Sequence, residues 1–181
     1  MSSIRRFYGI LKTLTVYYAK PFQHRAMKRL YGRFMGADGL AFDIGAHVGN
    51  RVRAWRALGT RVVAVEPQSS CLSILNRLYG RDAAVHIVPR ACGTAPGTAT
   101  LHVCETAPTL SSLSESWIST ITRTESFQGM SWERDEVVSV TTLDNLIAEH
   151  GVPDFVKVDV EGYEAEVLGG LSRAVPALSF E

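Results

Sequence analysis

The sequence lacks the cysteine and histidine patterns of a disulfide-stabilised or metal-binding domain. Its 181 residues contain three cysteines and no C-x-x-C pair, and an odd number argues against a disulfide framework. The five histidines show no metal-ligand spacing, so we expect no metal ion. No apolar run reaches the roughly 20 residues of a membrane-spanning helix, and Lys12 interrupts the one candidate for a signal-peptide core. These absences favour a cytoplasmic protein in a reducing compartment.

Acidic residues are absent from the first 37 positions. Residues 1–37 hold eight of the 19 Lys and Arg residues and seven aromatic residues, whereas all 18 Asp and Glu residues fall in residues 38–181. We therefore expect a basic helical N-terminal arm, residues 1–37, and one domain, residues 38–181. The apolar face of the arm can pack on the acidic domain, or the arm can contact the anionic inner face of a membrane. The acidity of the domain opposes nucleic-acid binding, and we expect no such partner.

Strand-like and helix-like segments alternate after the arm. This order predicts an α/β fold with a parallel sheet and helices on both faces. The expected strands are 40–42, 61–65, 84–88, 98–103 (an added or edge strand), 153–160 and 177–181. The expected helices are 52–58, 69–80 with a Ser69 or Ser70 cap, 142–147 with a Thr142 cap, and 163–171. Residues 105–136, rich in Ser and Thr, are expected to form a long functional or disordered loop.

Residues 40–49 (LAFDIGAHVG) describe a strand that turns sharply into a helix. Gly45 lets the backbone bend and leaves room for a ligand, since a Cβ would obstruct both. A dinucleotide-binding loop would carry glycine at the position of Asp43. Because Asp43 repels a pyrophosphate and attracts a cation, the loop predicts a nucleoside ligand with positive charge and no phosphate. S-adenosylmethionine, which carries sulfonium and ammonium groups, fits this description, and a nicotinamide oxidoreductase is disfavoured.

A second carboxylate supports the nucleoside site. The strand of residues 61–65 ends at Glu66-Pro67, which is 23 positions after Asp43. An acid at the end of the second strand, about 20 residues on, holds the ribose hydroxyls in this class of fold. A carboxylate accepts both hydroxyl hydrogens, so we predict that Glu66 binds the ribose.

A third acidic cluster, Asp159 to Glu164, begins at the far end of the strand of residues 153–160. Ligands in open parallel sheets lie beyond the carboxyl ends of the strands. Asp43, Glu66 and Asp159 are therefore expected on one rim, whereas Glu164 and Glu166 are expected to face solvent.

With these residues identified, the chain resembles the FkbM family of S-adenosylmethionine-dependent methyltransferases. The matching pieces are 42–49 (FDIGAHVG), 63–67 (VAVEP), 111–113 (SSL), 142–144 (TLD), 156–164 (VKVDVEGYE) and 180–181 (FE). The resemblance implies a Rossmann-like class I methyltransferase, commonly an O-methyltransferase that acts on a sugar or a secondary metabolite. The acceptor would therefore be a small molecule or a glycan.

The resemblance also assigns roles by position. Asp43 and Gly45 would contact the methionine part of the cofactor, and the Ala91-Cys92 turn would lie near the adenine. The full predicted cofactor site is Asp43, Gly45, His47, Gly49, Glu66, Pro67, Ala91 and Cys92. Asp159 and Glu161 are the predicted catalytic residues, and either would be the general base if burial raises its pKa. The predicted substrate residues are Ser111, Ser112 and Trp117.

One departure from the family leaves a rival interpretation. Class I methyltransferases normally add an antiparallel strand pair after the fifth core strand, where this sequence ends. We therefore expect a sheet without that pair, in a fragment or an unusually short member. The alternative function is a non-catalytic, methyltransferase-like module that serves as a membrane or partner adaptor through its basic arm.

Overall fold

A five-stranded parallel sheet forms the centre of the protein. The computed structural model describes Gly9, Thr15 and residues 21–181. In spatial order the strands are β3 (Val85–Val88), β2 (Arg61–Val65), β1 (Leu40–Ile44), β7 (Phe155–Val158) and β8 (Leu178–Phe180). All neighbouring strands run parallel. The predicted α/β architecture and its five core strands are confirmed.

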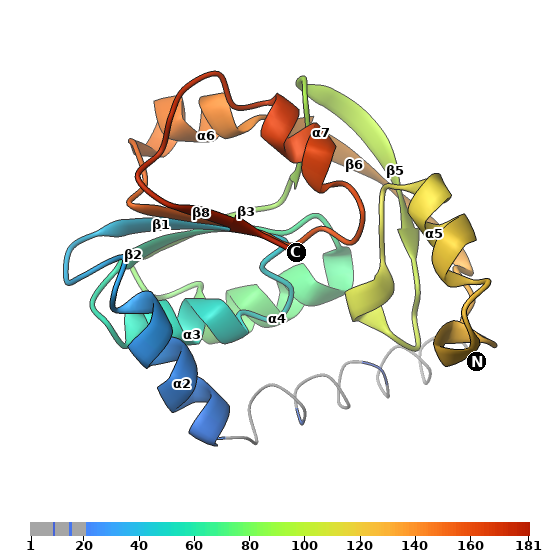
Figure 1. Cartoon of the computed structure of the whole chain (residues 1–181), viewed down its shortest axis with the longest axis horizontal. Helices are drawn as coiled ribbons and strands as arrows, with labels where there is room; N and C mark the ends of the chain where they lie inside the picture. The colour runs from blue at the N-terminus through green and yellow to red at the C-terminus, as the bar shows by residue number, and fades with distance from the viewer. Residues whose placement is uncertain (1–8, 10–14, 16–20) are drawn as a thin grey trace.

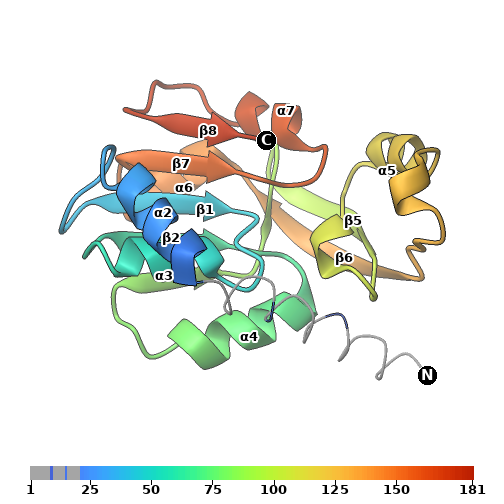
Figure 2. The ribbon, with the colours of Figure 1, turned by 60° about the horizontal axis from the view of Figure 1, so that its bottom comes forward.

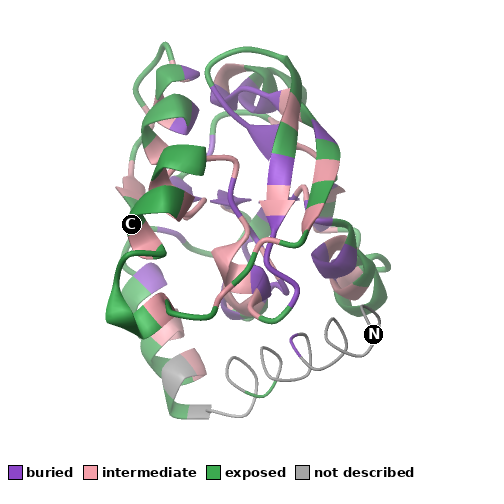
Figure 3. Cartoon of the chain, turned by 90° about the vertical axis from the view of Figure 1, so that its right-hand side faces the viewer, coloured by how far each residue is buried: buried purple, intermediate pink, exposed green. Residues whose placement is uncertain are grey.

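Helices cover both faces of this sheet, as predicted. In the view of Figure 1, α2 (Pro21–Tyr31), α3 (Asn50–Arg56) and α4 (Ser69–Tyr79) lie below it, and α6 (Leu143–His150) and α7 (Glu164–Gly169) lie above it. Two apolar clusters fill the two interfaces because successive side chains of a strand point to opposite faces. In β1, Phe42 and Ile44 belong to one cluster and Ala41 to the other. Buried residues accordingly gather in the strands and on the inner sides of the helices (Figure 3).

Helix α2 packs on the domain through its end nearest the sheet. Tyr31 is buried, and its ring centroid lies 5.3 Å from that of Trp55 and 5.4 Å from that of Phe155. Met35 is buried in the same cluster, so this end of the predicted arm packs on the domain. Residues 1–8, 10–14 and 16–20 of the predicted arm lie outside the described residues. Within the part of the chain that is described, no helix has both the length and the apolar character needed to cross a bilayer.

A second, smaller sheet was only partly predicted. It has the order β4 (Ala91–Cys92), β6 (Arg134–Thr141) and β5 (Gly97–Val103). The edge strand expected at residues 98–103 is confirmed as β5, which pairs antiparallel with β6. Residues 91–92 are a short strand and not the predicted turn. Figures 1 and 2 show this sheet beyond the end of the large sheet to which the strand arrows point.

The segment of residues 105–136, predicted as a loop, contains regular structure. It includes the 3-10 turns η1 (Pro108–Leu110) and η2 (Glu125–Phe127), the helix α5 (Glu115–Ile121) and the start of β6. The Ser and Thr residues that suggested a linker are consistent with a helix here, because Ser114 caps α5 by accepting a hydrogen bond from the Trp117 amide. The Thr142 cap of α6 is confirmed, whereas Gln68, and not Ser69 or Ser70, precedes α4.

Candidate active site

A pocket opens at the carboxyl ends of the central strands. Its space, together with the open solvent at its mouth, amounts to about 760 Å³. Its wall comes from the segments that follow β1, β2, β3 and β7, and from residues 108–113 on the side of the small sheet. The predicted site residues on this wall are Gly45, His47, Glu66, Pro67, Ala91, Cys92, Ser111, Ser112, Asp159 and Glu161.

Gly45 is required where β1 approaches β7. Its φ is +82°, and its amide donates to the carbonyl of Val65 at 2.9 Å. A Cβ at this position would overlap the backbone carbonyl oxygen of Asp159. The glycine therefore allows the turn and also brings Asp159 to the pocket.

We expect Gly45→Ala to lower the free energy of unfolding by at least about 2 kcal/mol, because the left-handed φ alone costs about 1–3 kcal/mol and the β7 carbonyl must also move. Urea denaturation measures the loss. The matched control is Gly97→Ala, since a Cβ there meets nothing within 4 Å. Equal stabilities of the two variants would contradict the close approach of the Asp159 carbonyl to Gly45.

Glu66 is a buried carboxylate fixed at the pocket wall. It is 6% exposed. Its Oε2 accepts from the His47 amide and its Oε1 from the Gln68 amide, each at 2.8 Å. Burial raises the pKa of Glu66 to about 7, against the effect of these two hydrogen bonds. The side chain is thus held in one orientation before any ligand arrives.

Asp43 lies behind the pocket and does not contribute to its wall. It is fully buried, and within the described residues neither of its oxygens has a hydrogen-bond partner. Burial raises its pKa to about 7, although the charge of Arg51 opposes this shift. Its predicted contact with the cofactor stays a prediction.

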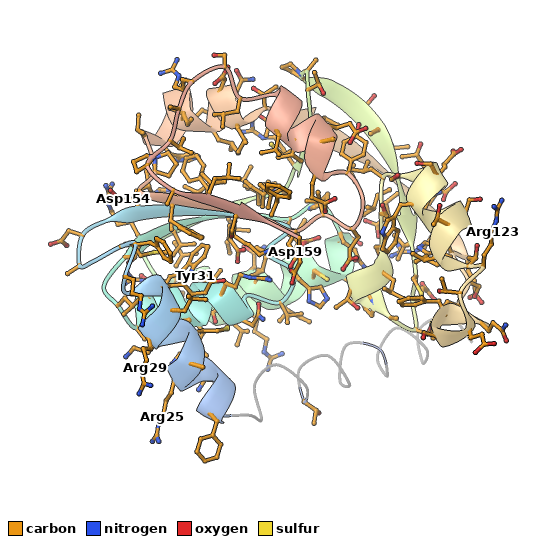
Figure 4. All side chains as sticks on the ribbon, in the orientation of Figure 1. Arg25, Arg29, Tyr31, Arg123, Asp154 and Asp159 are labelled. Atoms are coloured by element: carbon orange, nitrogen blue, oxygen red, sulfur yellow. The ribbon has the colours of Figure 1, made fainter. Side chains whose placement is uncertain are left out.

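Two cations that sequence reasoning missed accompany Asp159, which lies at the right-hand end of the sheet in Figure 4. Arg51 Nη2 donates to Asp159 Oδ2 at 2.6 Å and lies 3.5 Å from Glu181 Oε2. Lys157 Nζ, which is buried, donates to Glu181 Oε2 at 3.1 Å and lies 3.8 Å from Asp159 Oδ2. Asp159 is therefore held by cations from α3 and β7.

Glu161, unlike Asp159, has no cation in direct contact among the described residues. Burial, followed by the neighbouring Asp159 and Glu164 carboxylates, raises the pKa of Glu161 to about 7. Its φ of 54° is unusual for a residue with a side chain. Glu164 does not face solvent as predicted, since it accepts hydrogen bonds from the amides of Val160 and Gly162 and so fixes the Glu161 turn.

Residues 111–117 close this turn from the other side. Ser112 Oγ donates to the carbonyl of Glu161 at 2.6 Å, and Ser111 Oγ accepts from the Cys104 amide. Trp117 lies outside the pocket wall, and a Cβ on Gly162 would overlap its side chain. Ser112 and Trp117 therefore position the loop that carries Glu161.

Gly49 also lies outside the pocket wall. Its φ is +82°, and a Cβ there would meet the side chains of Tyr79 and Leu75. The Tyr79 hydroxyl donates to its carbonyl at 3.1 Å. The structure places Gly49 against α4, and its predicted cofactor role stays untested.

The family model described as the methyltransferase FkbM domain matches residues 43–179. The chain belongs to the FkbM methyltransferase family. This match confirms the predicted family and spans the pocket, from β1 to β8. It makes S-adenosylmethionine the expected cofactor of the domain.

Solved structures similar to this FkbM domain include three methyltransferases. They are the glycopeptide N-methyltransferase MtfA complexed with sinefungin (18% identity, TM-score 0.31, 36% of this chain and 28% of that chain), the C-terminal domain of precorrin-6Y C5,15-methyltransferase from Rhodobacter capsulatus (14%, 0.40, 78% and 52%) and a putative S-adenosyl-L-methionine-dependent methyltransferase from Methanococcus maripaludis (16%, 0.37, 46% and 40%). The chain thus spans between 28% and 52% of their lengths. No curated protein matches it.

The buried carboxyl of Asp43 is expected to make the stability of the FkbM domain depend on pH. The folded protein keeps a proton on Asp43 up to about pH 7, whereas the unfolded chain releases it near pH 4. Asp43 therefore weakens the folded state as pH rises through this window, and Asp43→Asn should be more stable than wild type by a few kcal/mol at about pH 8.

The difference between the two proteins should shrink as pH falls from about 7 to about 4. His47, whose pKa burial lowers to about 4, acts in the opposite direction in both proteins, so only their difference isolates Asp43. Urea denaturation at several pH values measures it, with the exposed Asp38→Asn as the control. A wild type that is the more stable of the two at pH 8 would refute the expectation.

Proposed function

We propose that this protein is an S-adenosylmethionine-dependent methyltransferase that methylates a hydroxyl group of a sugar or secondary metabolite. One observation carries the proposal: Glu161, a partly buried carboxyl whose pKa is raised to about 7, shares a pocket wall with Glu66. A hydroxyl acceptor needs its proton removed during attack, and a base with a pKa near the working pH does this best.

The residues of the pocket fit the proposed cofactor. Glu66, already ordered by two amides, would accept the ribose hydroxyls. The buried pair Ala91 and Cys92 offers an apolar wall for the adenine. The backbone at Gly45 and His47, on the same wall, would contact the methionine part of the cofactor. When bound, the cofactor supplies an activated methyl group on its sulfonium.

Glu161 is the proposed general base, and Asp159 a positioning residue. Asp159 Oδ2 already accepts from Arg51, so it holds this cation beside the pocket. The Glu161 carboxylate has no such partner and is ionised above about pH 7. Leu101, Pro108 and Leu113 on the opposite wall help to exclude water from the reacting groups.

Calorimetric titration with S-adenosylhomocysteine and with NAD tests the proposed cofactor. Micromolar affinity for S-adenosylhomocysteine and no heat with NAD are expected. No binding of S-adenosylhomocysteine would reject the proposal in favour of a non-catalytic module. Incubation with labelled S-adenosylmethionine and a panel of sugars, phenols and amines tests the acceptor. Transfer to amines alone would reject O-methylation.

A further inference from the structure

The outer face of α2 carries a row of exposed apolar side chains. Phe22 is 79% exposed, Leu30 is 51% exposed, and Phe34, in the turn after the helix, is 49% exposed. Together with the exposed Ala26 they recur every fourth residue, so they lie along one side of the helix. The other side buries Tyr31 and Met35 against the domain. Phe34 also lies against Phe155, with 5.5 Å between the ring centroids. Phe22 and Leu30 are therefore the members of the row that are additional to the packing that holds α2 in place.

A basic row runs beside the apolar one. Arg25, Arg29 and Arg33 are exposed and also recur every fourth residue. No acidic residue precedes Asp38 in the sequence, and none of the three arginines forms an ion pair within the described residues. Figure 4 shows the Arg25 and Arg29 side chains pointing away from the domain, whereas Tyr31 points toward the sheet.

These two rows match the chemistry of an anionic lipid surface. The guanidinium groups would pair with lipid phosphates, and the apolar side chains would enter the boundary between headgroups and acyl chains. A nucleic acid would satisfy the arginines and leave Phe22 and Leu30 in water. Residues 38–181 carry 18 acidic and 11 basic residues, so an anionic surface would repel the rest of the domain and favour contact through α2.

We propose that the outer face of α2, formed by Phe22, Arg25, Arg29, Leu30, Arg33 and Phe34, docks this protein on an anionic lipid bilayer. The proposal is independent of the methyl-transfer chemistry, because none of these residues lines the pocket.

Sedimentation of the full chain with vesicles tests it. The vesicles are phosphatidylcholine, with and without about one third phosphatidylglycerol, at about 0.15 M salt. We expect binding to the anionic vesicles only. Arg25→Gln/Arg29→Gln/Arg33→Gln should lower the partition constant on the order of a hundredfold, since each basic residue near such a surface contributes about fivefold.

Two matched controls separate docking from charge and folding. Arg77→Gln/Arg81→Gln/Arg123→Gln makes the same charge change at exposed arginines elsewhere, of which Arg123 lies at the far side of the protein in Figure 4, and it should reduce binding much less. All variants should keep the wild-type affinity for S-adenosylhomocysteine. The triple α2 variant binding as tightly as wild type, or wild type binding both kinds of vesicle equally or neither, would overturn the proposal.

The apolar row needs its own variant. Phe22→Ser/Leu30→Ser should weaken binding to anionic vesicles at least tenfold by the loss of buried apolar area, whereas Leu78→Ser/Val152→Ser, at exposed apolar positions elsewhere, should not. If the apolar variant binds vesicles as wild type does while the arginine variant loses RNA binding, the face is a nucleic-acid site. If Phe22→Ser/Leu30→Ser instead converts a dimer to a monomer, the face joins two copies. Either result would overturn the proposal.

Discussion

Replacing Glu161 by glutamine is expected to lower kcat about 10²–10⁴-fold, the usual contribution of a general base. The amide keeps the size of the side chain and cannot accept the proton of the acceptor hydroxyl. The affinity for S-adenosylhomocysteine should stay within about threefold of wild type, because Glu66, the proposed ribose acceptor, is untouched. Single-turnover transfer of a labelled methyl group measures the change.

The pH profile distinguishes a lost base from a damaged fold. Since the pKa of Glu161 is raised to about 7, the wild-type rate should rise with pH up to about 7 and then level. The residual rate of Glu161→Gln should lack this step. The control is Glu166→Gln, an exposed carboxyl on the helix α7 that follows Glu161, which should leave both rate and profile unchanged. If Glu161→Gln keeps the wild-type kcat, Glu161 is not the general base and another residue removes the proton.

Glu161 and Asp159 were equivalent candidates in the sequence, and the structure separates them. Both follow the same strand, and both lie on the pocket wall. The difference is Arg51, whose guanidinium contacts Asp159 across 108 positions of the chain. A contact of that span leaves no local pattern, so neither Arg51 nor the distinction could be read from residues 154–164.

The parts of the fold that could be predicted are those in which burial sets the pattern. Strands that are buried on both faces, such as β2 and β7, consist mostly of apolar residues and can be recognised in the sequence. Glu66 and Asp159 directly follow these two strands, so their positions could be predicted as well. In the small sheet β6 escaped prediction because it begins with Arg134, Asp135 and Glu136, and exposes Val137. Its pairing with β5 compensates for this mixed composition, and that pairing is a tertiary property.

Two glycines in one turn also show what the sequence could not predict. Gly45 and Gly49 share a φ of +82°, and the sequence suggested that both serve the ligand. The carbonyl of Asp159 occupies the space beside Gly45, and the α4 side chains of Tyr79 and Leu75 occupy the space beside Gly49. A glycine in a turn therefore predicts a close approach, but the identity of the approaching group depends on the packing of distant elements.

Glu66→Gln is expected to weaken binding of S-adenosylhomocysteine about 10–100-fold, because a hydrogen bond to a charged group contributes about 1.5–3 kcal/mol. The amide nitrogen of glutamine also faces either the His47 or the Gln68 amide, both of which donate to Glu66. Calorimetric titration measures the loss, with the exposed Glu125→Gln as the control.

A ligand without the 2′-hydroxyl shows whether this loss arises at the ribose. Wild type should bind 2′-deoxy-S-adenosylhomocysteine about tenfold or more weakly than the parent, since a buried acceptor is left unpaired. In Glu66→Gln the two ligands should differ much less, because the carboxylate that distinguishes them is gone. If the variant instead weakens both ligands by one common factor, Glu66 acts by holding the turn at His47 and Gln68, and the ribose is bound elsewhere.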